Sequence, residues 1–170
     1  PGDLGEGSVA FGINPRDAMM LPTTFSYDTN DFLGTFGGTI EHTGSVFFND
    51  DAVEVGNFTI GFDAARASGT ASGFFVESTV GIPAILFDVA PPTALSATAT
   101  DLTIAADLLV SPEFAGFLGD TGLTGADVGD ALVEGVSQAA AQVPVPATLA
   151  LFTLGLAGIG YRHRRATGTA

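Results

Sequence analysis

The sequence contains no cysteine and no lysine among its 170 residues. Without cysteine the chain can form neither disulfides nor thiolate metal sites, and without lysine it has no amine side chain for Schiff-base catalysis. Histidine is nearly absent too, since only His42 and His163 occur. A Ser-His-Asp triad in the body would have to use His42, and no serine lies in a Gly-x-Ser-x-Gly elbow. We therefore expect a protein that is not an enzyme, with His42 an ordinary exposed residue.

Charged residues are scarce and almost all of one sign. Asp, Glu, Lys and Arg make up 14% of the chain, against roughly a quarter in ordinary soluble domains. Residues 1–161 contain all 19 acidic residues and two arginines, a net charge of −17, whereas residues 162–170 contribute +3. Such a body has no cations to replace phosphate counterions, which excludes electrostatic binding of nucleic acid. Anionic lipid headgroups would repel it unless divalent ions screened the charge.

Residues 8–110 have the pattern of β-structure. Phenylalanines and β-branched residues recur in short runs that Gly, Asn, Asp and Pro separate, which is typical of strands joined by turns. The expected strands include residues 9–13, 23–27, 34–40, 45–48, 52–55, 73–79 and 84–89. The turn cluster Asn-Asp-Asp at 49–51 predicts a hairpin between the fourth and fifth of these. The last strand lies between prolines, which favours a position at the edge or end of a sheet.

Two shifts in the alternation of apolar residues indicate sharp bends. Val53 and Val55 are apolar at odd positions, but the apolar residues from Phe58 to Phe62 are even-numbered. A similar shift occurs around Asp101. Because side chains alternate faces with period 2, the chain must bulge or turn at these points. Bent strands without long helices predict an antiparallel, jelly-roll-like β-sandwich over residues 1–110.

Residues 111–145 are expected to hold short helices and a stalk. The run Ser-Pro-Glu at 111–113 supplies an N-cap serine, a proline at the first helical position and an acid in the first turn. A second, weaker helix is predicted from the i, i+4 spacing of Val128, Leu132 and Val136.

An uncharged, apolar stretch occupies residues 146–161. Its sixteen residues would reach about 24 Å as a helix, and the hydrocarbon core of a bilayer is roughly 30 Å thick. We predict one transmembrane helix here, because a buried core helix, the alternative, seldom runs directly into a cluster of arginines. Gly155, Gly158 and Gly160 would permit close packing against another helix.

The cations after this stretch predict its orientation. Arg162, Arg164 and Arg165 are the only cation cluster in the chain. By the positive-inside rule the tail, residues 162–170, is cytoplasmic, and the body lies in the periplasm or outside the cell. The protein would then be a single-pass protein of a bacterial membrane.

The order of these C-terminal elements resembles a known sorting signal. Val143-Pro144-Val145-Pro146-Ala147, an apolar helix rich in Leu and Gly, and the arginines follow one another within residues 143–165. This arrangement is similar to the PEP-CTERM signal of exported proteins in many Gram-negative bacteria. The resemblance implies processing by an exosortase, a membrane enzyme, and a surface or matrix destination, often with extracellular polysaccharide. Pro144, Val145 and Pro146 would form the motif, with Val145 in the place of its glutamate.

Calcium is the one cofactor that the residues suggest. Asp28, Asn30 and Asp31 lie in one oxygen-rich turn, and Asp120, Asp127 and Asp130 lie in a second loop. Carboxylate and amide oxygens are ligands that Ca²⁺ prefers. Neither segment matches an EF-hand loop, and Asp and Asn also favour turns without any metal.

Two functions remain open from the sequence alone. The first is a non-catalytic, membrane-anchored or surface-sorted extracytoplasmic protein with a structural or adhesive role, acting through sheet faces or edge strands. The second is an accessory subunit that stabilises a larger membrane complex, photosynthetic or respiratory, through its transmembrane helix and periplasmic β-domain. The expected partners are the lipid bilayer and either an exosortase-like enzyme or neighbouring membrane helices, but no nucleic acid.

Overall fold

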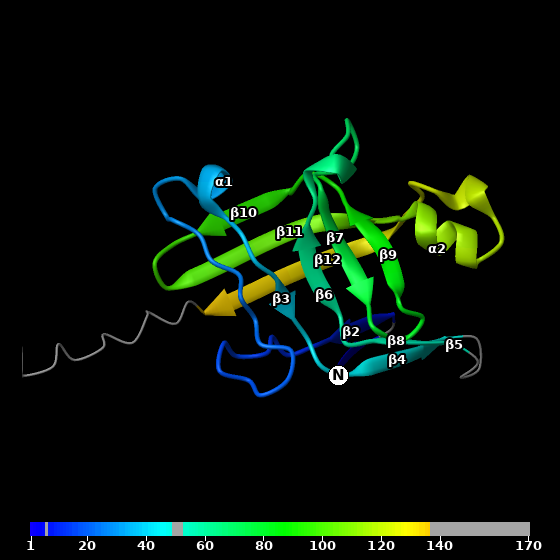
Figure 1. Cartoon of the computed structure of the whole chain (residues 1–170), viewed down its shortest axis with the longest axis horizontal. Helices are drawn as coiled ribbons and strands as arrows, with labels where there is room; N and C mark the ends of the chain where they lie inside the picture. Colours follow the sequence, from blue (N-terminus) through cyan, green and yellow to red (C-terminus); the bar gives the residue numbers. More distant parts are fainter. Residues whose placement is uncertain (6, 49–52, 137–170) are drawn as a thin grey trace, which may run out of the picture. The chain divides into compact units, whose positions relative to one another are not determined.

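A computed structural model describes residues 1–5, 7–48 and 53–136, and in this region the fold is mainly β and antiparallel, as predicted (Figure 1). The strands are β1 (Gly2–Gly5), β2 (Ser8–Ala10), β3 (Ile40–Glu41), β4 (Ser45–Phe48), β5 (Val53–Gly56), β6 (Thr59–Phe62), β7 (Phe74–Ser78), β8 (Val80–Gly81), β9 (Ala84–Val89), β10 (Ala94–Ala97), β11 (Asp101–Val110) and β12 (Asp127–Val136). Short helices α1 (Phe32–Thr35) and α2 (Pro112–Phe117) and the 3-10 turns η1 (Ala64–Arg66) and η2 (Thr121–Leu123) lie between strands.

The longest strands, β11 and β12, organise the main sheet. β11 pairs along one side with β12 and along the other with β10 and then β9, and β9 continues the sheet through β7 and β6 to β3. β9 and β10 are two parts of one strand that a bulge interrupts. On either side of Pro91-Pro92, Ala90 N donates to Asp107 O (3.0 Å) and Thr93 N donates to Ala105 O (2.8 Å). The bulge holds the prolines, which have no N–H to donate to the ladder.

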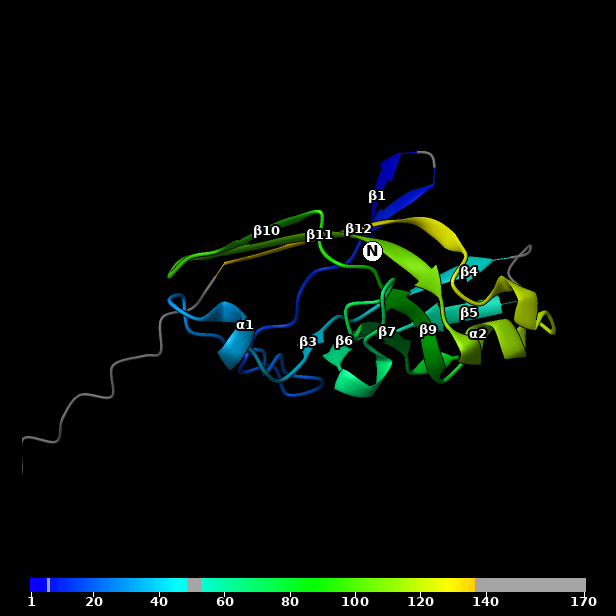
Figure 2. The same cartoon turned by 90° about the horizontal axis from the view of Figure 1, so that it is seen from above.

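This sheet curls over itself into a half-barrel. Figure 2 shows β10, β11 and β12 above β3, β6 and β7. The space between is filled by an apolar core around Phe25, Ile40 and Leu102, against which Ile60 and Val133 pack. The two layers expected of a sandwich are thus formed largely by one curled sheet.

A second core lies beneath the small sheet β4-β5-β8. Val55, Ile82 and Leu86 are buried there, and Phe87 and Phe114 pack against them. Phe114 brings α2 onto β9, so this cluster attaches the helix to the main sheet. A separate hairpin pairs β1 with β2.

Several predicted elements are confirmed. β4 and β5 pair as the expected hairpin, and β7 and β9 coincide closely with predicted strands. The bend at Gly56 moves the chain from the three-stranded to the seven-stranded sheet, with Asn57 at φ 48°. α2 begins as predicted, with the Ser111 side chain accepting from Phe114 N.

Several predictions are wrong. Residues 23–27 do not form a strand, and Ser26 makes only an isolated bridge with Gly37. Residues 128–136 are not a helix but part of β12, so the main sheet continues past residue 110. Residues 34–40 do not form a strand, because Asp31 Oδ1 accepts from Gly34 N and caps α1 instead. β9 is not an edge strand, since it pairs with both β7 and β11; its flanking prolines lie outside the paired residues.

No helix in residues 1–5, 7–48 and 53–136 is long and apolar enough to cross a membrane. The predicted span, its packing glycines Gly155, Gly158 and Gly160, and the sorting and anchor residues Pro144, Val145, Pro146, Arg162, Arg164 and Arg165 lie outside the described residues.

Candidate functional site

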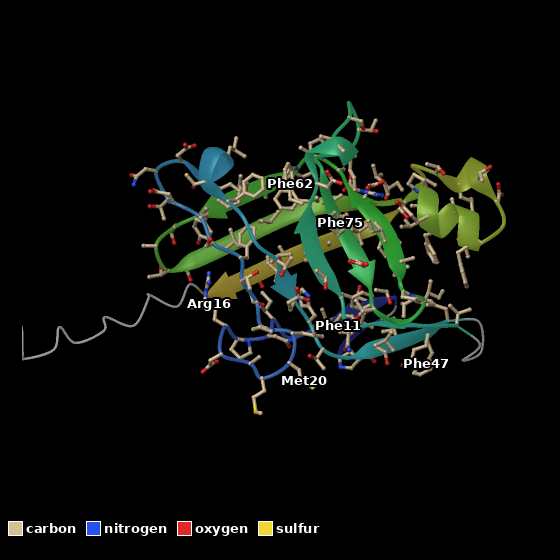
Figure 3. The ribbon with its side chains drawn as sticks, in the orientation of Figure 1. Phe11, Arg16, Met20, Phe47, Phe62 and Phe75 are labelled. Atoms are coloured by element: carbon tan, nitrogen blue, oxygen red, sulfur yellow. The ribbon has the colours of Figure 1, made fainter. Side chains whose placement is uncertain are left out.

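An apolar groove of about 400 Å³ opens beside α1. Its lining comes from α1, the β6–β7 pair and the β10–β11 pair: Phe32, Leu33, Phe36, Phe62, Ser72, Phe74, Pro92, Leu95 and Ile104. Large apolar side chains are exposed at its rim, with Phe62 and Leu95 each 42% and Leu33 75% accessible to solvent. Figure 3 shows Phe62 between α1 and the β6–β7 pair.

Strand pairing and one helix cap bring the rings of this groove together. Phe62 and Phe74 are register partners on β6 and β7, with ring centroids 5.2 Å apart. Phe36 lies 4.9 Å from Phe62 and 5.0 Å from Phe74 between centroids, and it stacks on Phe32 at 5.6 Å. The sequence separates these phenylalanines by up to 42 positions, and their periodicity gives no sign that they meet.

The groove can hold an apolar group but has little means of orienting a polar one. No charged side chain lines it, and Ser72 is its one polar side chain. The Ser72 hydroxyl already donates to Val89 O at 2.7 Å. Catalytic and ligand sites usually combine an apolar lining with convergent polar groups, so the chemistry that this groove favours is apolar contact.

The first predicted calcium turn is held together by its own hydrogen bonds. Asp28 Oδ1 accepts from Asn30 N (2.8 Å) and from Asn30 Nδ2 (3.0 Å), and these bonds lower the pKa of Asp28. Asp31 caps α1. The two carboxylates therefore act as turn and cap acceptors, the metal-free arrangement that Asp and Asn favour.

The second predicted calcium loop is divided between a cap and a strand. Asp120 Oδ1 accepts from Gly122 N and caps η2, whereas Asp127 and Asp130 lie on β12. Opposite Asp130 on β11 lies Asp107, which the sequence reasoning did not single out. The pKa of Asp107 is raised by a hydrogen bond with the Asp130 carboxyl, by partial desolvation and by the charges of Asp127 and Asp130.

No group of three or more His, Cys, Asp or Glu side chains in the described part of the chain is arranged to hold a metal ion. Calcium remains a prediction from the sequence that this geometry does not single out. The sequence alone does not indicate that Asp107 lies near Asp127 and Asp130, because it is 20 positions from Asp127. Only the pairing of β11 with β12 brings them together.

His42 is buried, so the expectation of an exposed histidine is wrong. The residue is 9% accessible and forms a bridge with Ile13. Its Nδ1 lies 3.1 Å from Phe58 O. Desolvation lowers the pKa of His42, although the hydrogen bond to Phe58 and the charge of Glu41 act in the opposite direction.

Arg66 makes every ion pair found among the described residues. Its Nε donates to Asp88 Oδ1 on β9 at 2.7 Å, and its two terminal nitrogens donate to both oxygens of Glu113 on α2 at 2.7 and 2.9 Å. The guanidinium also lies 6.0 Å from the centre of the Phe75 ring. These pairs lower the pKa of Glu113 to about 2. The cluster joins η1, β9 and α2 and has the character of a structural clamp.

The geometry thus defines a β-rich body with an apolar groove. The chain then continues into a C-terminal segment with its own sequence signature. Residues 142–165 match the family model of the PEP-CTERM protein-sorting motif. The resemblance over residues 143–165 is therefore confirmed, and the chain carries this motif. The motif marks an extracytoplasmic, surface-sorted protein with an exosortase-like processing partner. No curated protein and no solved structure matches the chain.

Proposed function

We propose that this protein is a non-catalytic structural or adhesive component of the bacterial cell surface, delivered there through its C-terminal motif. The observation that carries the proposal is the sorting motif at residues 142–165, which follows directly on a folded β-domain. In this proposal the motif directs export to the surface, and the β-domain is the part of the protein that remains after processing.

The side chains of the β-domain support a role in binding other molecules rather than in catalysis. Asp31 and Asp120 cap short helices, Asp28 holds a turn, and Asp88 and Glu113 bind Arg66, which are structural tasks. The groove beside α1 is lined mainly by phenylalanine and aliphatic side chains. Exposed apolar surface of this kind is typical of sites that bind other molecules.

Processing is tested by measuring the mass and location of the native protein. In cells with an exosortase we expect a product that ends near residues 144–146, at the cell surface or in the extracellular matrix. In cells without the enzyme we expect the full chain in the membrane fraction. Replacing Arg164 and Arg165 by Ala should reproduce the second pattern, whereas removing residues 166–170, outside the matched motif, should leave processing intact.

The same measurement separates this proposal from the second candidate. An accessory subunit of a membrane complex would keep its C-terminal segment and would copurify at fixed ratio with other membrane proteins. Finding the intact chain in such particles, in cells with an active exosortase, would overturn the surface proposal. A structural or adhesive role further requires that cells lacking the protein show weaker attachment or a less cohesive matrix, restored by the unchanged gene.

A further inference from the structure

The loop of residues 15–22 projects two methionines into solvent. A turn closes its first part, with Ala18 N donating to Pro15 O at 3.1 Å. Met19 is 102% and Met20 77% accessible, and these are the only methionines in the chain. Figure 3 labels Met20 at the edge of the molecule, below β3. Removing an exposed methionine side chain from water is favourable by about 1.5–3 kcal/mol of free energy. The loop therefore exposes apolar surface that could stabilise a complex.

The loop is held in this shape by contacts from outside it. Asn14 Nδ2 donates to Leu21 O at 3.0 Å and to Thr43 Oγ1 at 2.9 Å. Leu21 has φ 48°, in the left-handed region that non-glycine residues seldom adopt. Such backbone costs on the order of 1–3 kcal/mol and persists where the surroundings impose it. The exposure of the methionines is therefore built into the fold.

A cation accompanies these methionines. Arg16 lies at the start of the loop and donates through Nη2 to Phe25 O. Every ion pair among the described residues involves Arg66, so Arg16 makes no pair with a carboxylate there. Its remaining N–H groups are available in a body that is otherwise strongly acidic. A cation beside exposed apolar side chains suits the headgroup region of a bilayer.

The loop lies at the end of the body from which the chain continues to the sorting motif. Val136, the last residue of β12, pairs with Asp101. The Tyr27 hydroxyl donates to Thr98 O at 2.9 Å, in the turn just before Asp101, and Arg16 binds the carbonyl of Phe25, two residues from Tyr27. The ten residues from Val136 to Pro146 span at most about 35 Å. A membrane that holds the motif is therefore within reach of this end.

We propose that the loop of residues 15–22 contacts the interface of a neutral phospholipid bilayer while the motif is still in the membrane. Met19 and Met20 enter the boundary between headgroups and acyl chains, and Arg16 binds a lipid phosphate. The bilayer is neutral because the acidic body would be repelled from anionic headgroups. The inference rests on the proposed function, since it requires the membrane-held stage before processing.

The absence of tryptophan from the chain allows a direct test. The full-length variants Met20→Trp and Phe117→Trp are reconstituted into phosphatidylcholine vesicles, with and without brominated acyl chains. Phe117 is the matched control, because it is 56% accessible and lies on α2, at the opposite end of β11 from Asp101. We expect a blue-shifted emission and quenching by bromine for Met20→Trp, and neither for Phe117→Trp. Adding anionic phosphatidylglycerol should reduce the quenching.

Two results would overturn the loop contact. One is unquenched emission from both variants in vesicles that carry the protein through flotation, and the other is equal quenching of both, which would mean non-specific adsorption. Failure of the chain to float with vesicles at all would instead contradict the membrane stage of the proposed function. A further variant, Met19→Ser with Met20→Ser, should still float but should expose residues 15–22 to protease in the presence of vesicles.

Discussion

At the scale of single residues, the described ion pairs converge on one side chain. Arg66 binds Asp88 and Glu113 and lies beside Phe75, so one guanidinium connects a turn, a strand and a helix. Arginine suits this position because its planar fork can bind a carboxylate with two parallel bonds. In a chain with so few cations, the loss of this residue cannot be compensated by a neighbour.

Glu113→Gln should make the stability less sensitive to acid. The native pKa of Glu113 is about 2, below the ordinary value of 4.5, because its carboxylate binds Arg66. Its contribution is therefore complete above pH 4.5 and is lost as the pH falls from 4.5 towards 2. Since the side chain is 43% accessible, screening limits the loss to about 1 kcal/mol. Urea unfolding at several pH values measures it, with Glu134→Gln, on the exposed face of β12, as the control.

His42 should make stability depend on pH in a higher window. Burial lowers its native pKa below the ordinary 6.5, so the unfolded chain takes up a proton before the folded chain does. The free energy of unfolding should then decrease as the pH falls below 6.5. In His42→Gln this decrease in the free energy of unfolding between about pH 7.5 and 5.5 should disappear. Urea unfolding at several pH values measures it. His163→Gln, a change at the other histidine of the chain, should retain this decrease. A slope that is unchanged in His42→Gln would contradict the assignment to His42.

At the scale of elements, a close approach between β5 and β8 depends on a glycine. Gly81 has φ 69°, and a Cβ there would meet the carbonyl of Glu54 on the neighbouring strand. Gly81→Ala should therefore open the β5–β8 pair and lower the free energy of unfolding by about 2 kcal/mol or more. Gly116→Ala in α2, where a Cβ meets nothing, should be neutral or slightly stabilising. Thermal unfolding measures the Tm of both variants. A loss in Gly81→Ala alone indicates strain at Gly81, and an equal loss in both would contradict it.

The pattern of apolar residues predicts some of the strands but not all of them. Short runs of phenylalanine and β-branched residues, bounded by turn residues, are enough to place β4, β5, β7 and β9. β12 was mistaken for a helix because Val128, Leu132 and Val136 are four positions apart, a spacing that fits a helix face and one face of a strand equally well. In the structure Leu132 and Val136 lie on the exposed face, and Val133 between them packs into the core.

The groove and the clamp could not be predicted for a different reason. Their residues are brought together by pairing between distant strands, and one sequence contains no direct signal of that pairing. Phe62 meets Phe74 through the β6–β7 register, and Arg66 meets Glu113 across 47 positions. The sorting motif is the opposite case. Its signal is a linear order of elements, so residues 143–165 could be recognised before any fold was considered.

At the scale of the whole molecule, charge repulsion should weaken the body in a way that salt reverses. Residues 1–161 carry a net charge of −17, and repulsion between surface charges is screened beyond about 10 Å at 0.1 M salt. We therefore expect Tm to rise between low salt and 0.2 M NaCl. No change would mean that the carboxylates are spaced too widely to interact. A fall would mean that salt weakens attractive pairs such as those of Arg66 more than it relieves repulsion.

The same experiment with divalent ions tests the calcium hypothesis. Asp28, Asp31 and Asp120 serve as turn or cap acceptors, so we expect CaCl₂ and MgCl₂ to raise Tm equally at matched ionic strength, through screening alone. A larger rise with CaCl₂ would instead demonstrate a selective site, because Ca²⁺ and Mg²⁺ differ in the cage they require and not in charge. Asp28→Asn and Asp130→Asn would then locate it, since each should abolish the excess only if its own loop binds the ion.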